Sequence, residues 1–236
     1  MKCRLFFAFM LLGGVSGGDI VYEVTFEDPP HVLDQPIVVG VGSDRPSSYI
    51  GNLYCRAGLG DFTSQVASAE SAMITFNPGV VFTAGLVRMS WDMAVLQTQG
   101  SEPEQVTANI QATAGGHPPG MYFVYYINGE IRLGTDVVGS YTLGLQDHFE
   151  VVMDMDNDRF DVLLNSVYLR TNEVMSSNWS PEQLGFNTGF MASPRYAVDN
   201  VRWEIIPEPS TNVLISLGGA GFILKYLYEK HKKQKE

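Results

Sequence analysis

Lysine is missing from the whole central part of this sequence. The lysines lie near the two ends, at Lys2, Lys225, Lys230, Lys232, Lys233 and Lys235. The cations between them are arginines, and acidic side chains outnumber these, so the chain has a formal net charge of −11. A nucleic-acid partner is not expected, because a phosphate backbone is bound through a basic surface. An acidic body of this kind stays soluble and can attract divalent cations.

Cysteine is almost absent, with only Cys3 and Cys55. Cys3 lies in the first residues, ahead of an apolar stretch, and therefore cannot be the lipid-bearing cysteine of a lipoprotein, which stands at the cleavage point. Once the N-terminal segment is removed, Cys55 has no partner and no internal disulfide can form. We expect Cys55 to be a small buried apolar residue.

Recognisable catalytic patterns are also missing. The sequence has no Gly-x-Ser-x-Gly elbow, no phosphate-binding loop and no Cys-His pair, and its four histidines are scattered. The Glu-x-Asp-x-x-Glu strand motif of jelly-roll glycosidases is absent too. We therefore expect a protein that is not an enzyme and has no cofactor, although a glycosidase with a dispersed carboxylate pair stays open as an alternative.

Residues 1–18 have the layout of a secretory signal peptide. Lys2 and Arg4 precede an apolar stretch at residues 5–12, and small residues follow at 13–18. This order of charged, apolar and small segments is the one that directs export. Cleavage near Gly17 or Gly18 would leave a mature chain that starts close to Asp19.

Residues 19–206 are long enough for one domain, and they are rich in strand patterns. Apolar and polar residues alternate in several segments, at 20–26, 87–95, 106–112 and 196–206. The segment at 87–95 predicts a half-buried strand. Only Ser180-Pro181-Glu182-Gln183 has the cap and N1 proline of a short helix. The expected fold class is all-β, an antiparallel jelly-roll β-sandwich.

Two hairpins are marked by their turn residues. Residues 122–127 and 131–133 flank Asn128-Gly129, a pair that tolerates positive φ. Residues 149–155 and 160–164 flank Asp156-Asn157-Asp158, and Asn165-Ser166 predicts a further turn. The opening Val-x-Phe-Glu segment at residues 24–27, the second hairpin and the closing Asp199-Asn200-Val201 strand resemble those of concanavalin A-like or laminin-G-like jelly rolls.

Residues 207–236 form a C-terminal tail with three parts. Pro207, Glu208, Pro209 and Ser210 should be extended and accessible, because proline fixes φ and has no N–H. Residues 211–228 give about 27 Å of helix, barely enough to span a bilayer. Residues 229–236 are basic. With Lys225, the lysines at 230, 232, 233 and 235 place the end of the chain in the cytoplasm and the body outside.

This tail resembles the PEP-CTERM sorting signal of Gram-negative bacteria. The tripeptide Pro207, Glu208, Pro209, the apolar span and the basic end match the family pattern in order. The resemblance implies a membrane-anchored precursor that exosortase cuts and passes to the envelope or to an exopolysaccharide matrix. A plain C-terminal membrane anchor is the alternative, since a span with lysines needs no peptidase to hold a protein.

Three aspartates form the densest oxygen cluster of the sequence. Asp154, Asp156 and Asp158 alternate at a hairpin tip and could offer hard oxygen ligands to Ca²⁺, with Asp136, Asp147 or Asp199 as further ligands. The alternative is a polar turn made of good turn-forming residues.

Aromatic and amide side chains of the types that bind sugars are also present. They are Tyr122, Tyr125, Tyr126, Asn178, Trp179 and Asn187. Alternating aromatics also pack against one another in strands, so each of them can be a core residue instead. Together these features predict an exported, structural or adhesive surface or matrix protein, with a lectin-like glycan-binding module as the alternative.

Overall fold

The computed structural model describes residues 18–27, 30–40, 45–111, 121–175, 180–189 and 192–207. Outside these residues lie the first 17 residues of the expected signal peptide, Glu208, Pro209, the expected span at 211–228 and all six lysines. Within the described part, no helix is long and apolar enough to cross a membrane.

Thirteen β-strands make up the described fold. They are β1 (Asp19–Val24), β2 (Ser48–Ala57), β3 (Gln65–Phe76), β4 (Leu86–Gln97), β5 (Glu104–Gln111), β6 (Met121–Tyr126), β7 (Glu130–Leu133), β8 (Asp136–Ser140), β9 (Asp147–Asp154), β10 (Arg159–Leu164), β11 (Val167–Val174), β12 (Gln183–Thr188) and β13 (Arg195–Ile206). Every pairing between them is antiparallel. The all-β, antiparallel prediction is confirmed.

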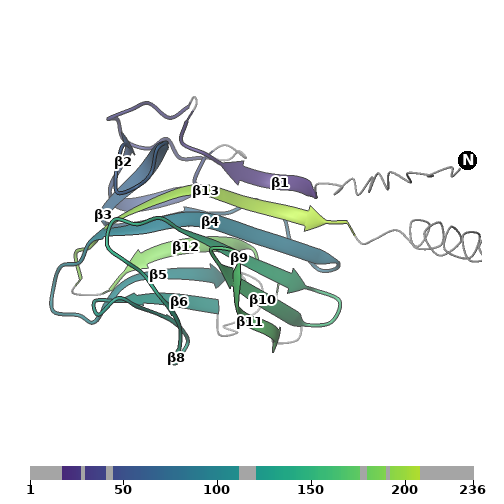
Figure 1. Ribbon diagram of the computed structural model, residues 1–236. Helices are drawn as coiled ribbons and strands as arrows, with labels where there is room; N and C mark the ends of the chain where they lie inside the picture. Colours follow the sequence, from purple (N-terminus) through teal and green to yellow (C-terminus); the bar gives the residue numbers. More distant parts are fainter. Residues whose placement is uncertain are drawn as a thin grey trace, which may run out of the picture.

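One curled sheet supplies both layers of the molecule (Figure 1). Its hydrogen-bonded order is β11-β10-β9-β4-β13-β3-β12-β5-β6-β7-β8, with β1 added to β13 and β2 added to β3. The sheet folds over at β3, whose first half pairs with β13 and whose second half pairs with β12. The layer that contains β4, β9 and β13 therefore faces the layer that contains β12, β5 and β6, as in a jelly roll.

The bend in β3 has a local cause. Ser71 has a positive φ of 48° between the two halves of the strand. Opposite it, the β2–β3 register shifts at Gly51, which has a φ of 101°. A Cβ at Gly51 would lie 2.8 Å from the Cα of Ala72, so only glycine allows this close approach. The bulge turns the chain from one layer to the other.

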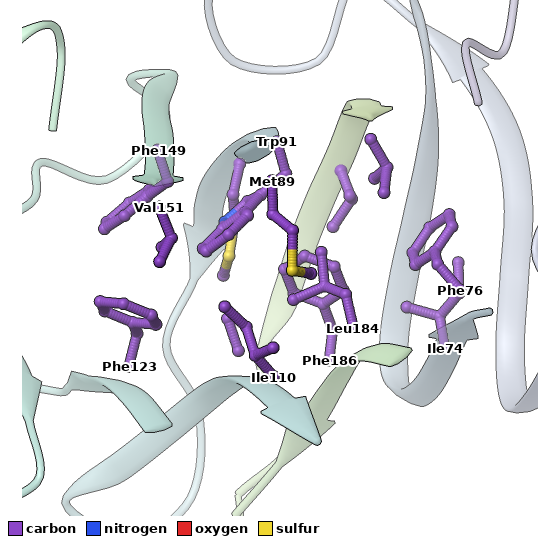
Figure 2. Close-up of a cluster of buried hydrophobic side chains, with 14 of the residues drawn as sticks. Ile74, Phe76, Met89, Trp91, Ile110, Phe123, Phe149, Val151, Leu184 and Phe186 are labelled. Atoms are coloured by element: carbon purple, nitrogen blue, oxygen red, sulfur yellow. The ribbon is translucent and has the colours of Figure 1, made fainter. Parts of the chain in front are cut away.

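Aromatic side chains from both layers meet in the core (Figure 2). Trp91 on β4 stacks on Phe149 of β9, with ring centroids 5.2 Å apart and planes only 2° from parallel. From the opposite layer, Phe123 of β6 and Phe186 of β12 meet the indole edge-on, at 5.7 Å and 6.2 Å. These contacts join the two layers at their centre.

The prediction for β4 is confirmed in its pattern and wrong in its degree of burial. Val87, Met89 and Trp91 face the main core as expected. The outer face of β4 is not solvent-exposed throughout, because Ala94 packs with Phe62, which lies in the loop before β3, in a second, smaller cluster. The end of β4 is thus covered on both faces.

The predicted turns are confirmed. Gly129 has a φ of 86° in the turn between β6 and β7, and β9 pairs with β10 across the aspartate turn. Asn165 and Ser166 have φ values of 51° and 65°, as a type I′ turn requires. Cys55 is fully buried, as expected.

The predicted helix at Ser180 is wrong. The Ser180 hydroxyl donates to the carbonyl oxygen of Phe82 at 2.8 Å instead of capping a helix, and Gln183 begins β12. Leu184 and Phe186 are buried between β3 and β5. Pairing with two neighbouring strands outweighs a local capping preference.

Replacing Trp91 with alanine tests the importance of this contact between layers. We expect Trp91→Ala to lower the free energy of unfolding by about 3 to 5 kcal/mol, since the indole is fully buried and its cavity cannot collapse easily. Tyr168→Ala is the control, because Tyr168 is 61% exposed and should change stability by less than about 0.5 kcal/mol. Urea unfolding followed by circular dichroism measures both. Equal effects of the two substitutions would contradict the proposed core.

Candidate functional site

One outer surface of the sandwich carries amide and aromatic side chains. It is the side of β12, β5, β6 and β7 that faces away from the core. In the observed register, the residues there lie between core positions such as Ile110 and Phe123. We name this surface the amide–aromatic face and define it by Thr107, Asn109, Gln111, Tyr122, Tyr126, Arg132, Gln183 and Asn187.

The amides of this face lie on β5 and β12. The Gln183 side chain donates to the side-chain oxygen of its cross-strand partner Gln111. One row further along, Asn109 pairs with Gly185. A Cβ on Gly185 would lie only 3.0 Å from Oδ1 of Asn109, so the missing side chain gives the amide its room. Asn109 is only 2% exposed, and within the described residues its Oδ1 accepts no hydrogen bond.

The ring of Tyr126 is fixed by its neighbours. Its hydroxyl donates to Oε1 of Glu104 at 3.0 Å, and the Arg132 guanidinium lies 4.4 Å from the ring centre. Arg132 in turn donates twice to Glu130, at 3.0 Å and 2.6 Å. Partial burial and the hydrogen bond to Glu104 raise the pKa of Tyr126, which is therefore neutral at physiological pH. This arrangement presents an oriented ring beside charged donors and acceptors.

Tyr122 supplies the exposed ring of the face. It lies opposite Asn109 in the β5–β6 register and is 39% exposed. Tyr125, on the same strand, points the other way and packs against Phe149 and Tyr141 in the core. Of the sugar-binding candidates in the sequence, the structure thus brings Tyr122, Tyr126 and Asn187 together and assigns Tyr125 to the core. Asn178 and Trp179 lie outside the described residues.

The sequence reading missed the other members of the face. Asn109 and Gln111 carried a usable signal, because they alternate with buried Ala108 and Ile110 in a strand that was predicted. Gln183 carried no such signal, since Ser180-Pro181-Glu182-Gln183 has the pattern of a helix start.

The outer surface of the opposite layer is charged instead. We name it the charged face and define it by Arg88 and Asp92 of β4, His148 and Glu150 of β9, and Asn200, Arg202 and Glu204 of β13. Side chains of this face form hydrogen bonds and ion pairs with one another. Nδ1 of His148 lies 2.6 Å from Oδ1 of Asp92, and Asn200 donates to Oδ2 of Asp92, also at 2.6 Å. The Asp92 carboxylate raises the pKa of His148.

Asp199 is a buried acid beside the charged face. It lies opposite Asp92 in the β4–β13 register, is 1% exposed, and accepts a hydrogen bond from the Ser64 hydroxyl at 2.8 Å. Burial raises its pKa to about 6. Asp92 and Asp199 are neighbouring carboxylates of the kind that a glycosidase needs. Both are buried, however, so neither is open to a sugar polymer.

The three aspartates proposed for calcium lie in and beside the β9–β10 turn. Asp154 accepts hydrogen bonds from the backbone of residues 156 and 157, and Asp156 accepts one from the backbone of Gly85 at 3.1 Å. Asp147 lies at the opposite end of β9, too far away to complete a site. Within the described part of the chain, no three His, Cys, Asp or Glu side chains are placed to hold a metal ion. Calcium binding at Asp154, Asp156 and Asp158 stays a prediction.

Comparison with protein-family models and with curated proteins finds no match to the sequence. Comparison with solved structures finds proteins of similar fold. A carbohydrate esterase from the Shiga toxin-encoding bacteriophage phi24B is similar with a TM-score of 0.51 and 6% identity, over 81% of this chain and 100% of its own.

A mutant sialidase from Trypanosoma rangeli is similar with a TM-score of 0.51 and 11% identity, over 84% of this chain. The chain spans only 32% of that sialidase. Domain 4 of an extracellular arabinanase from Geobacillus stearothermophilus, in complex with arabinotriose, aligns with a TM-score of 0.49 and 12% identity, over 84% of this chain and 98% of its own. The jelly-roll β-sandwich fold expected from the sequence is confirmed.

The buried acid Asp199 gives a prediction on pH. Its pKa is about 6 in the folded protein, against an ordinary value of 3.8. A raised carboxyl pKa stabilises the fold at low pH, and this contribution is lost as pH rises from about 4 to about 6. Between pH 4 and pH 7 the wild type should therefore lose up to about 3 kcal/mol more of its free energy of unfolding than Asp199→Asn.

Urea unfolding at several pH values measures this difference. Asp136→Asn is the control, since it makes the same chemical change at a largely exposed side chain. His148, whose pKa is also raised, shifts stability in the same direction in all three proteins and cancels in the comparison. Parallel profiles for the wild type and Asp199→Asn would contradict the assignment.

Proposed function

We propose that this protein is an exported, non-enzymatic β-sandwich that binds glycans on its amide–aromatic face and acts as a structural or adhesive component of the cell surface or matrix. The observation that supports this best is the exposed ring of Tyr122 on the same face as the partly exposed amides of Gln111 and Gln183. A sugar ring offers an apolar face for stacking and hydroxyl groups for amide donors and acceptors.

The charged face supports a binding role less well. Its carboxylates already pair with Arg88, His148 and Arg202, so a ligand would have to displace existing ion pairs. The burial of Asp92 and Asp199 likewise disfavours the glycosidase alternative. We propose that the protein is not an enzyme, because the carboxylates of the charged face are already ion-paired and Asp92 and Asp199 are buried.

The export route is the second part of the proposal. The signal peptide within residues 1–18 and the PEP-CTERM-like tail at residues 207–236 would deliver the body to the outside of a Gram-negative cell. Exosortase is the proposed partner for the tail. An exopolysaccharide is then the glycan most available to the amide–aromatic face.

Glycan binding is tested by calorimetry with soluble exopolysaccharide fragments, after a glycan array has selected a ligand. We expect Tyr122→Ala and Gln111→Ala each to weaken binding about tenfold, because each removes a stacking or hydrogen-bonding group worth about 1.4 kcal/mol. Tyr168→Ala removes an exposed ring from β11, which is not part of the face, and should leave the affinity unchanged. Unchanged urea midpoints would show that the variants still fold.

Titrations with calcium and with a chelator separate the two predicted ligands. Glycan binding that persists after chelation shows that the site does not need calcium. No binding to any array glycan, with or without calcium, would contradict the lectin-like proposal.

Sorting is tested by replacing Pro207, Glu208 and Pro209 together with alanine. We expect the substituted protein to stay in the membrane at its uncut size, because the peptidase would no longer read the tripeptide. The wild-type protein should lose the tail in cells with exosortase and keep it in cells without one, as intact mass will show. Identical mass and membrane retention in all of these cells would instead indicate a plain anchor.

A further inference from the structure

The first described residue of the chain meets a buried carboxylate. The backbone nitrogen of Gly18 donates to Oε1 of Glu204 at 2.8 Å, just before β1 joins β13. Glu204 is only 6% exposed, although its carboxylate lies on the charged face. An ordinary amide N–H is a neutral partner, and a buried charge is satisfied better by a charged donor.

The approach to Glu204 is possible only for glycine. A Cβ on residue 18 would lie 2.4 Å from Cγ of Glu204 and 2.5 Å from the carbonyl oxygen of Ile205. The nitrogen of residue 18 is therefore held against the carboxylate by close contact with the backbone of β13. The contact leaves no room for a side chain at position 18.

The charges around Glu204 are unbalanced. Arg202 lies 3.3 Å from Glu204 and 3.9 Å from Glu23. Arg88 lies 3.7 Å from Glu204 and 3.4 Å from Glu150. Three carboxylates thus share two guanidinium groups within the described part of the chain. His148 lies 3.8 Å from Glu150 but also pairs with Asp92, so this pair adds one charge of each sign when the imidazole is protonated.

We propose that signal peptidase cuts between Gly17 and Gly18, and that the ammonium group freed on Gly18 binds Glu204 as the missing cation of this cluster. The sequence leaves two bonds open, since small residues precede the cut in either case, and the contact with Glu204 selects the one before Gly18. Hydrolysis of the Gly17–Gly18 peptide bond by water leaves a carboxylate on Gly17 and an amine on Gly18, which takes up a proton at neutral pH. The hydrogen bond to Glu204 then becomes charge-assisted.

This inference rests on the export part of the proposed function. Removal of the leader strengthens the attachment of β1 to β13, so the mature chain is more stable than the precursor. Processing is thereby coupled to the final stability of the sandwich.

The first test is the N-terminal sequence and intact mass of the protein recovered from exporting cells. A first residue of Gly18 supports the proposal, and a first residue of Asp19 overturns it. A chain that still begins at Met1 would contradict the export proposal, while the second test still decides whether the Glu204 site prefers an ammonium group.

The second test compares two purified chains, each extending to Glu236, one beginning at Gly18 and the other at Ser16. Each is released from a fusion that leaves no extra residue. The longer chain moves its ammonium group about 7 Å away. Glu204→Gln should lower the folding equilibrium constant more in the chain that begins at Gly18, by on the order of tenfold. An equal loss in both chains would overturn the ammonium site. Because the same substitution is made in both chains, any general destabilisation that it causes cancels in the comparison.

Discussion

The contact of Trp91 with aromatic side chains of both layers is the constraint on which the rest of the structure depends. A single sheet folds over on itself only when apolar side chains of its two halves are buried between the layers. Phe149 beside the indole and Phe123 and Phe186 across from it fill that space. Because the inner positions are fixed by this packing, the alternation of the strands decides which side chains point outward. Both outer faces follow from it.

The polar side chains of the two outer faces differ in how they are paired. On the charged face, acids and bases from β4, β9 and β13 form ion pairs across the strands. On the amide–aromatic face, neutral amides and rings leave hydrogen-bonding capacity unused, as at Oδ1 of Asn109. An uncharged ligand that binds the amides of the second face does not have to separate ion pairs, as it would on the charged face.

The sequence predicted the parts of the fold that have local causes. The alternation in β4 and the Asn128-Gly129 turn need no distant information, and both were correctly placed. The sequence of β3 does not predict a strand clearly, because Ala67, Ala69 and Ala72 are small and give no strong strand signal. β12 was missed, since its pairing with β3 and β5 is decided far away in the sequence.

The functional faces were predictable only within single strands. Tyr122 and Tyr126 could be recognised from one hairpin, but the partners that make a face of them lie on β5, β7 and β12. The contacts of Asp92 with His148 and with Asn200 join three strands, and these residues form no motif in the sequence. Such clusters become visible only when the order of the strands is known, because hydrogen-bonded register places them opposite one another.

The pairing of β1 with β13 places the two ends of the body side by side. Asp19 lies opposite Ile205, so residues 18 and 207 leave the sandwich at the same end (Figure 1). If both the leader and the tail hold the precursor at the membrane, they hold it by one end. Removing either segment leaves β13 paired with β3, β4 and β1, and the core around Trp91 is untouched. A chain with this arrangement could be trimmed at both ends without losing its fold, because β1 and β13, which adjoin the two proposed cut sites, pair with each other within the sheet.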